Sequence, residues 1–220
     1  MNKNPHALFF NPPITDYFFG HQTSEIWRDN IYAPYLPKEK KGSVCVDIGG
    51  NIGVTAYYFS QFFERVIVCE PALEHFEVLT HMINYNHLDN VEPHKLAIHL
   101  KDEVLPLSHN KNKTMYSLHT SVDDGSSAPE VVKVIPIDTL FEDNKIEHCN
   151  LLKVDIEGSE TELFSGPGFK KIAPLVDTIV TERHAWNGRN PNQLDEALKM
   201  NGFKVSGVPS SADIVVATRL

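Results

Sequence analysis

The sequence contains no long hydrophobic run. No segment approaches the roughly 18 consecutive apolar residues that a membrane-spanning helix needs. The N-terminus also lacks a basic region followed by an apolar stretch and a cleavage site, which is the pattern of a secretory signal. We therefore expect a soluble, cytoplasmic protein with no membrane partner.

Cysteine is scarce, and its spacing does not suit a metal site. The chain has 3 cysteines, Cys45, Cys69 and Cys149, and no Cys-x-x-Cys pair. All three fall in or beside apolar stretches that we predict to be buried strands. This pattern indicates free thiols in a reducing compartment, and it argues against a disulfide framework or a cysteine-bound metal.

Positive charge is also in short supply. Lys and Arg number 20 against 29 Asp and Glu, which gives a formal net charge of −9. The densest basic stretch is the short Lys-Glu-Lys-Lys run at 38–41. Because nucleic-acid binding depends on neutralising phosphates, we predict no nucleic-acid partner.

The sequence has no internal repeats and no low-complexity tracts. Its 220 residues are 41% hydrophobic and 22% charged, which suits a single α/β domain and leaves too little chain for two. We place this domain at residues 41–220 and treat residues 1–40 as an N-terminal arm.

The clearest pattern in the chain is the run SVCVDIGGNIGVTAYYFSQFFERVIVCEP at 43–71. It predicts a buried strand at 44–48, a glycine-rich turn, a helix, and a second buried strand at 66–69 that ends on Glu70. This order forms the first half of a doubly wound nucleotide-binding fold. Glu70 stands 17 residues after Gly53, where a carboxylate can accept hydrogen bonds from two ribose hydroxyls.

The spacing of the glycines distinguishes between cofactors. A dinucleotide-binding site has the pattern Gly-x-Gly-x-x-Gly facing a pyrophosphate, whereas this chain has Asp47-x-Gly49-x-x-x-Gly53. The carboxylate of Asp47 would repel a pyrophosphate but can attract the ammonium and sulfonium of S-adenosylmethionine. The pattern therefore favours S-adenosylmethionine over NAD. A nucleotide- or NAD-linked oxidoreductase and a non-catalytic binding module that retains the fold are the alternatives.

Apolar periodicity continues to alternate between strands and helices after Glu70. The expected helices are 73–85, a short one capped by Asp138, one beginning over 160–164, and 191–200; the expected strands are 91–98, 131–135, 150–156, 176–182, 203–208 and 213–218. Strands at 104–107 and 114–118 around a polar tip predict an inserted β-hairpin. Two strands after the last helix are typical of a methyltransferase sheet. We therefore predict an α/β fold, a doubly wound, seven-stranded, mostly parallel sheet of the Rossmann-like class I methyltransferase type.

Five segments resemble the FkbM-type methyltransferases in order and spacing. They are VDIGGNIG (46–53), VIVCEP (66–71), NYNHLDNV (84–91), IDTL (137–140) and LLKVDIEGSE (151–160). The last is the most specific, because the first two occur in many class I methyltransferases. The resemblance implies S-adenosylmethionine-dependent O-methylation of a sugar, a glycan or another hydroxyl-bearing small metabolite.

The expected cofactor site begins at the glycine turn. We expect Asp47 to bind the methionine ammonium of S-adenosylmethionine, directly or through water, and Glu70 to hold the ribose diol. Gly49 and Gly53 would let the loop pass beneath the ligand. Asn51 would shape the turn or contact the methionine end.

Two further cofactor positions come from the resemblance. Ala97 is similar to the small residue that the family carries at the end of the third strand, where it leaves room for adenine. Asn86 resembles an asparagine of the family, although it can equally cap the preceding helix.

Catalysis is expected at the carboxyl ends of the fourth and fifth strands, next to the methyl donor. Asp155 is the first candidate to touch cofactor or substrate, and Glu182 and His184 are the next. A carboxylate or an imidazole there can act as general base toward a hydroxyl. Lys153 shares the face of Asp155 by strand alternation, so it could orient that carboxylate or complete a buried ion pair.

Two further acids and a metal site complete the candidates. We expect Glu157 and Glu160 in the first turn of the next helix, where acids favour the helix dipole. Asp155, Glu182 and His184 offer ligands for Mg²⁺, but their spacing is not a sharp metal motif. We therefore predict no metal.

The first forty residues are rich in aromatic side chains and proline. The aromatic ones are Phe9, Phe10, Tyr17, Phe18, Phe19, Trp27, Tyr32 and Tyr35. Such a segment is too aromatic for a disordered tail, so it is either a packed arm, over a sheet edge or a dimer contact, or a lid over the acceptor pocket. The hairpin tip at 108–113, with Tyr116 and His119 nearby, is the other candidate wall. The sequence does not indicate the oligomeric state.

Overall fold

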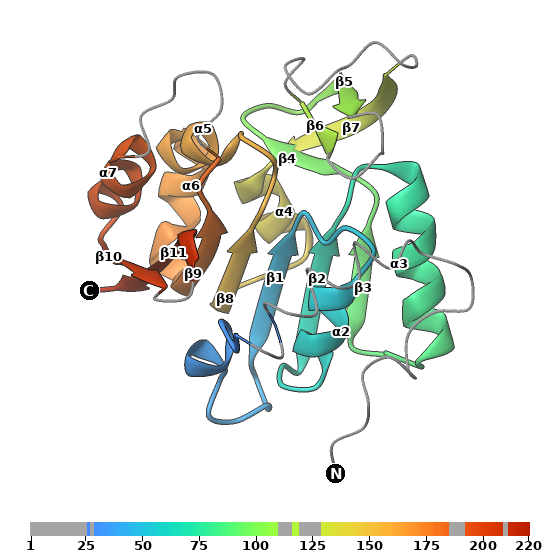
Figure 1. Ribbon diagram of the computed structural model, residues 1–220, viewed down its shortest axis with the longest axis horizontal. Coiled ribbons are helices and arrows are strands. Elements are labelled where there is room, and N and C mark those ends of the chain that lie inside the picture. Colours follow the sequence, from blue (N-terminus) through green and yellow to red (C-terminus); the bar gives the residue numbers. More distant parts are fainter. Residues whose placement is uncertain (1–25, 27–28, 110–115, 119–128, 185–191, 209–210) are drawn as a thin grey trace.

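The computed structural model describes residues 26, 29–109, 116–118, 129–184, 192–208 and 211–220, and in it the chain forms two sheets (Figure 1). The larger sheet has 7 strands in the order β10-β11-β9-β8-β1-β2-β3. The smaller has 4 strands in the order β4-β7-β5-β6. Figure 1 shows the smaller sheet above the edge toward which β1, β2 and β8 point.

The larger sheet is parallel except at one end. Its strands are β1 (Val44–Ile48), β2 (Arg65–Cys69), β3 (Val91–His94), β8 (Cys149–Val154), β9 (Val176–Glu182), β10 (Phe203–Val208) and β11 (Ser211–Arg219). β11 pairs antiparallel with both β9 and β10. The chain leaves β1 toward β2 and β3 and later returns on the other side of β1 with β8, so β1 and β8 meet at a topological switch point. Ligands bind beyond the strand ends at such a point.

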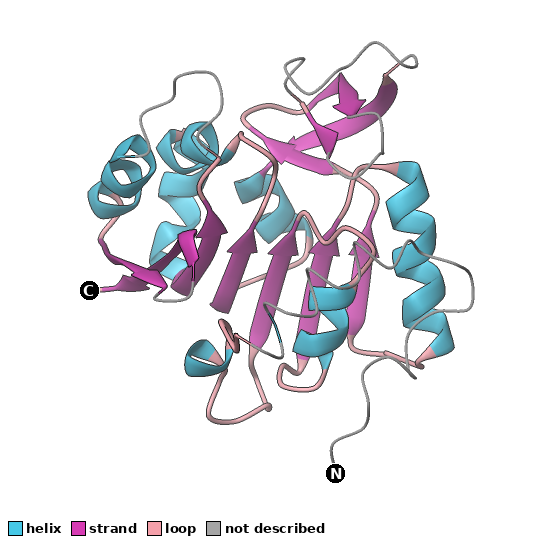
Figure 2. Ribbon diagram, viewed as in Figure 1, coloured by secondary structure: helices cyan, strands magenta, loops and turns pink. Residues whose placement is uncertain are grey.

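Helices cover both faces of this sheet (Figure 2). They are α2 (Val54–Ser60), α3 (Leu73–Tyr85), α4 (Ile137–Asp143), α5 (Glu160–Ser165), α6 (Pro167–Ile172) and α7 (Asn192–Met200), with short 3-10 turns η3 (Ala33–Tyr35) and η5 (Ala173–Leu175). The central strands β1, β2 and β8 are largely apolar because both of their faces are buried. Val66 faces the cluster under α2 and α3, and its neighbour Ile67 faces the cluster under α4 to α7.

The predicted fold class is confirmed, and one strand differs from the prediction. The expected strand 91–98 is divided into β3 and β4 (Ala97–His99), which belong to different sheets. β3 tolerates Pro93 because it lies at the sheet edge. The chain then turns at Lys95 and Leu96, and β4 pairs in parallel with β7 (Glu130–Pro136) instead.

The predicted hairpin is confirmed in its strands. β5 (Glu103–His109) pairs antiparallel with β6 (Tyr116–Ser117), and β5 also pairs antiparallel with β7. Ser108 and His109, which we assigned to the polar tip, are in β5 instead, because they pair with Ser117 and Tyr116. Residues 110–115 of the tip lie outside the described residues.

A second correction concerns Asp138. It was expected to cap α4, but the capping position is Pro136, and Asp138 lies inside the first turn. Its carboxylate accepts a hydrogen bond from the Lys171 ammonium of α6, so it joins two helices.

The described part of the N-terminal segment contributes to the core. Ile26, Ile31 and Tyr32 are buried in the cluster on the α2 side of the sheet. Most of the segment lies outside the described residues, and its role as an arm or lid stays a prediction. The three cysteines are free and buried, as expected. Among the described residues, no helix is long and apolar enough to cross a membrane.

Candidate active site

A pocket of about 610 Å³ opens at the carboxyl ends of β1, β2 and β8, beneath the smaller sheet. Five of the residues predicted from the sequence line it: Gly49, Asn51, Glu70, Ala97 and Asp155. The other predicted residues, Asp47, Gly53, Asn86, Glu182 and His184, are not among its lining residues.

Glu70 is a buried carboxylate on the wall of this pocket, 4% exposed. One of its oxygens accepts a hydrogen bond from the Asn51 N–H and the other from the Ala72 N–H, both at 2.9 Å. These two bonds occupy half of the carboxylate's acceptor sites, so each oxygen can still accept from a ligand. Burial raises the pKa of Glu70 to about 7, although the two N–H donors act to lower it.

The glycine turn is built by contacts within the protein. The N–H groups of Gly49 and Gly50 both donate to the Cys69 carbonyl, at 2.9 and 3.0 Å, which joins the end of β1 to the end of β2. Gly49 has a φ of +81°, and a Cβ there would collide with the carbonyl oxygen of Asp155. The turn therefore needs glycine for the approach of β8 to β1.

Gly53 has a packing role that the sequence did not indicate. Its φ is +94°, and a Cβ would collide with Leu79 and Met82 of α3. Gly53 does not line the pocket, so the prediction that it passes beneath the ligand is not supported by its position. Asn86 lies at the far end of α3, where its side-chain N–H donates to the Met82 carbonyl at 2.8 Å. It caps the helix, and its expected contact with adenine is not supported by this position.

Asp47 lies below the pocket and is fully buried. One carboxylate oxygen accepts a hydrogen bond from the Thr55 hydroxyl at 2.5 Å, and the other lies 3.1 Å from the Lys153 Nζ. Lys153 also donates to the Gly49 carbonyl at 2.7 Å. The carboxylate of Asp47 thus has partners within the protein, and the expected direct contact with a methionine ammonium is not supported.

Lys153 is held as an ammonium in this buried place. Burial opposes its charge, but the carboxylates of Asp47 and, 3.8 Å away, Asp155 raise the pKa of Lys153. The expectation that Lys153 completes a buried ion pair is confirmed, with Asp47 as its nearer partner. It also lies close enough to Asp155 to orient that carboxylate.

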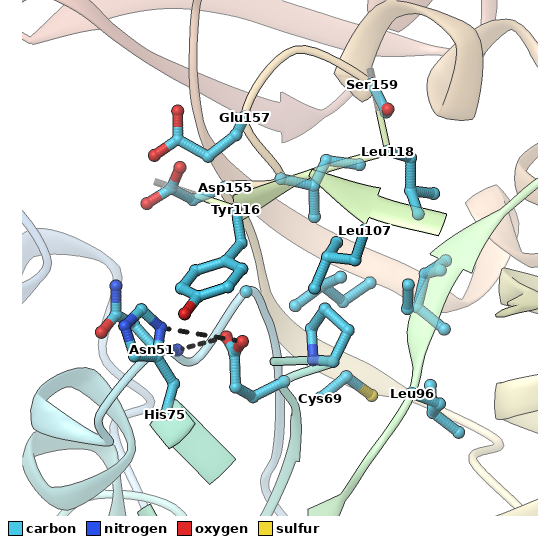
Figure 3. A pocket seen from close by; sticks show the side chains of 17 residues that line it. Asn51, Cys69, His75, Leu96, Leu107, Tyr116, Leu118, Asp155, Glu157 and Ser159 are labelled. Carbon is cyan, nitrogen blue, oxygen red and sulfur yellow. Dashed lines mark hydrogen bonds and ion pairs between the residues drawn. The ribbon is translucent and has the colours of Figure 1, made fainter. Parts of the chain in front are cut away.

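The pocket has a polar side and an apolar side. Figure 3 shows Asn51, Asp155 and Glu157 on one side and Leu96, Leu107 and Leu118 on the other. An elongated ligand with a polar end and an apolar, planar end fits such a lining.

Two residues complete the polar side. Tyr116, which we named as a candidate wall, lines the pocket from β6, and its ring lies 4.7 Å from that of His75. His75 was missed by the sequence analysis. Its Nδ1 lies 3.9 Å from a Glu70 oxygen, and its only sequence signal was its place in the first turn of the helix after Glu70.

Next to this pocket, four carboxylates surround the imidazole of His184. Its Nδ1 lies 2.9 Å from Glu160, and its Nε2 lies 3.3 Å from Glu157. Oxygens of Asp155 and Glu182 each lie 3.9 Å from Nε2. The structure thus brings together all three predicted catalytic residues, with Glu157 and Glu160 added to them.

The surroundings of His184 decide its charge. Burial alone would lower its pKa, but hydrogen bonds to Glu157 and Glu160 and the charges of Glu160 and Asp155 raise the pKa of His184 to about 11. An imidazolium has no free lone pair and cannot accept a proton, so these surroundings do not favour His184 as general base at neutral pH, and its catalytic role stays a prediction. Asp155 and Glu182 are left as the candidates.

Glu157 and Glu160 shape the loop after β8. Glu160 begins α5, and its carboxylate accepts from the N–H groups of Ile156 and Gly158, at 3.0 Å and 3.1–3.2 Å. Glu157 lies in the turn before the helix with a φ of +53°, so its expected place in the first helical turn is wrong. The Ser117 hydroxyl of β6 donates to the Glu157 carbonyl at 2.8 Å and ties this turn to the smaller sheet.

Metal ligation is geometrically possible at this cluster. Ligand atoms of Asp155, Glu157 and His184 lie within 4.8 Å of one another. A metal ion there would have to displace the proton on His184. The absence of a metal stays a prediction.

The strand order, the switch-point pocket and the acidic residue at the end of β2 together define a class I methyltransferase fold. The family model of the methyltransferase FkbM domain matches residues 47–205. The chain therefore belongs to the FkbM methyltransferase family.

Relatives of known sequence or structure agree with this assignment. Methyltransferase 1 of the fungus Beauveria bassiana is 27% identical over 180 residues, which cover 72% of this chain and 70% of the relative. The crystal structure of the methyltransferase FkbM from Methylobacillus flagellatus matches 93% of this chain with a TM-score of 0.54 and 15% identity. This chain covers only 55% of that structure.

Two more distant structures share the fold. A protein of Streptococcus mutans, assigned as a methyltransferase and crystallised with SAH, matches 88% of this chain and 96% of its own, with a TM-score of 0.51 and 9% identity. A protein of Clostridium thermocellum, assigned as an rRNA methylase, matches 95% of this chain and 98% of its own, with a TM-score of 0.52 and 11% identity. At these identities the likeness concerns the fold alone.

Proposed function

We propose that this methyltransferase uses S-adenosylmethionine and methylates a hydroxyl group of a sugar, a glycan or a small metabolite. The observation that carries the cofactor assignment is Glu70, a buried carboxylate beside the glycine turn with acceptor sites left for a ligand. The Streptococcus mutans protein of the same fold, crystallised with SAH, supports the same cofactor class.

The residues of the pocket fit the parts of this cofactor. Glu70 would accept hydrogen bonds from the two ribose hydroxyls, and the apolar side around Leu96 and Leu107 would hold the adenine. Ala97 also lines the pocket and, as the family resemblance implies for it, would leave room for the base. Asn51, at the polar side, would contact the methionine end.

Methyl transfer from this donor requires that the protein align the acceptor hydroxyl and provide a proton acceptor. When bound, S-adenosylmethionine supplies an electrophilic methyl group: the acceptor oxygen forms the new C–O bond, the electrons of the broken C–S bond stay on sulfur, and the hydroxyl loses its proton. Asp155 lines the donor pocket with a side chain that is 34% exposed, so we assign it the role of proton acceptor. Lys153 and the His184 imidazolium hold its carboxylate from two sides, at 3.8 and 3.9 Å.

Calorimetric titration of the protein with S-adenosylhomocysteine and with NAD tests the cofactor assignment. We expect binding of the first only. Glu70→Gln should weaken it by about 1.5–3 kcal/mol, roughly 10- to 100-fold, because a charged acceptor of two hydroxyls is lost. Glu77→Gln changes an exposed acid on α3, the helix that follows Glu70; it is the matched control and should bind like the wild type.

The alternatives give different results in the same titration. Binding of NAD in place of S-adenosylhomocysteine would point to the oxidoreductase. Binding of S-adenosylhomocysteine without methyl transfer to any acceptor, in a screen of cell-derived glycans and metabolites with a labelled donor, would point to a non-catalytic module. Equal affinity in Glu70→Gln would contradict the ribose assignment.

A further inference from the structure

The donor pocket has an acidic lining. Glu70, Asp155 and Glu157 are among its lining residues, and no Lys or Arg is among the described residues that line it. His75 is the only one of these lining residues with a basic side chain. The described part of the chain therefore borders this space mainly with negative charge.

The two cations next to the pocket are held by carboxylates that do not line it. The Lys153 Nζ lies 3.1 Å from Asp47, its nearer carboxylate partner. The His184 Nδ1 lies 2.9 Å from Glu160, which is the nearest carboxylate to that ring. The carboxylates that do line the pocket are therefore compensated only in part.

Asp155 and Glu157 lie together on the polar side of the pocket (Figure 3). Their side chains are 34% and 23% exposed, so water screens them only in part, and charges in such places interact more strongly than in bulk water. Burial raises the pKa of Glu157, although the His184 imidazolium acts to lower it. A positive ligand group on this side would stabilise both carboxylates in their charged form.

The methyl donor and its product differ by one positive charge. S-adenosylmethionine carries a sulfonium, whereas S-adenosylhomocysteine has a neutral thioether in its place. Because the proposed function assigns Glu70 to the ribose and the apolar side to the adenine, the polar side is left for the sulfur and the methionine end. Carboxylates on that side attract the charged donor and add little to the binding of the neutral product.

We propose that Asp155 and Glu157 make this pocket selective for the positively charged donor over its neutral product. The inference rests on the proposed function, because it takes Glu70 to hold the ribose. Asp155 accepts the proton of the acceptor hydroxyl as the C–S bond breaks and the new C–O bond forms, so the positive charge moves from sulfur to a proton on Asp155. The attraction is then lost and the product is released. Glu157 is a specificity-determining residue and takes no part in bond making.

The test is calorimetric titration of the full chain with S-adenosylmethionine and, separately, with S-adenosylhomocysteine, in the absence of an acceptor. The variants are Glu157→Gln and Asp155→Asn. Glu196→Gln, which changes an exposed acid of α7 outside the donor pocket, is the control. Each titration is repeated at about 50 mM and about 500 mM salt, because salt screens charges that are partly exposed. The melting temperature is recorded on the same samples.

We expect the wild type and Glu196→Gln to bind S-adenosylmethionine about tenfold or more tightly than S-adenosylhomocysteine. Glu157→Gln and Asp155→Asn should each lose about tenfold of their affinity for S-adenosylmethionine, with affinity for S-adenosylhomocysteine within about twofold of the wild type. The preference of the wild type should shrink at the higher salt concentration. A merely structural role would weaken both ligands alike, so the ratio of the two affinities separates the roles even where the melting temperature falls.

Three results would overturn the inference. One is equal or tighter binding of S-adenosylhomocysteine by the wild type, the second is a preference that neither variant reduces, and the third is an equal loss of both affinities in both variants. In each case the wild type still binds these ligands, so the proposed function stands. Failure of the wild type to bind either ligand would instead reject the proposed function itself.

Discussion

At the scale of single residues, surroundings decide which ionisable groups can do chemistry. His184 and Asp155 lie 3.9 Å apart at the ends of neighbouring strands, and both are candidate bases by residue type. The imidazole is enclosed by carboxylates that keep it protonated, whereas Asp155 lines the donor pocket with a side chain that is 34% exposed. Of these two groups, Asp155 is the one that can take the proton in the proposed reaction, while the His184 imidazolium is held among the carboxylates.

The substitution Asp155→Asn tests the proposed role of Asp155 as proton acceptor. We expect turnover to fall by about a hundredfold or more, because the amide cannot accept the proton, while affinity for S-adenosylhomocysteine changes little. Methyl transfer from labelled S-adenosylmethionine to an acceptor found in the metabolite screen is the measurement. Asp102→Asn, at an exposed position, is the control. Near-full activity in Asp155→Asn would mean that alignment alone carries the reaction.

The sequence singled out Asp155 and Glu70 because each lies near the carboxyl end of a predicted buried strand, and such ends gather at one edge of a parallel sheet. It could not identify the protonation state of His184, because that state depends on Glu157 and Glu160, which only the folded turn after β8 brings to the ring. The sequence also could not show that Asp47 lies below the pocket and does not line it. A carboxylate at the end of β1 and one beneath it have the same sequence pattern.

At the scale of elements, the end of β1 and the end of β8 depend on one close contact. The Gly49 turn packs against the Asp155 carbonyl, and the Asp155 N–H donates to the Ile48 carbonyl at 3.0 Å. The glycine turn after β1 and the loop after β8 are thus in direct backbone contact. A side chain at Gly49 would separate them.

Gly49→Ala and Gly42→Ala form a matched pair. Both glycines have a positive φ, +81° and +74°, but an added Cβ at Gly42 meets nothing within 4 Å. Gly42→Ala should cost only the left-handed backbone strain, about 1–2 kcal/mol. Gly49→Ala should cost about 4 kcal/mol or more in urea unfolding, in the exceptional range for one substitution. An equal loss of unfolding free energy in the two variants would show that the backbone at Asp155 can move to accommodate the added Cβ.

Elements with a strong local period were predicted with their observed bounds, as for 44–48, 73–85 and 176–182. The strand predicted at 91–98 was divided because pairing is not local. The partner of β4 is β7, more than thirty residues later in the chain, and nothing within 91–98 signals it. The predicted cap of α4 was wrong for a similar reason: Pro136, and not Asp138, takes the capping position.

At the scale of the whole molecule, the site lies where the two sheets meet, so folding and ionisation are linked. The pKa of His184 is about 11 in the folded protein and near 6.5 when unfolded. Between these values the folded state binds one more proton than the unfolded state. The stabilisation is therefore complete below pH 6.5 and is lost as the pH rises toward 11.

Urea unfolding at a series of pH values measures this linkage. Within that window, the free energy of unfolding of the wild type should fall by up to about 1.4 kcal/mol per pH unit more steeply than that of His184→Gln. His148→Gln, which removes an exposed histidine, is the control and should keep the wild-type slope. Parallel curves for the wild type and His184→Gln would show that His184 titrates normally.

The buried pair of Asp47 and Lys153 constrains how this chain can change over evolution. The two residues stand 106 positions apart in the sequence, yet their charges neutralise each other beneath the site. Loss of either one alone leaves a buried charge uncompensated, at a cost of about 3–5 kcal/mol. A neutral replacement is tolerable only if both positions change together. Across descendants of this sequence these two positions should therefore covary, although neither residue lines the donor pocket.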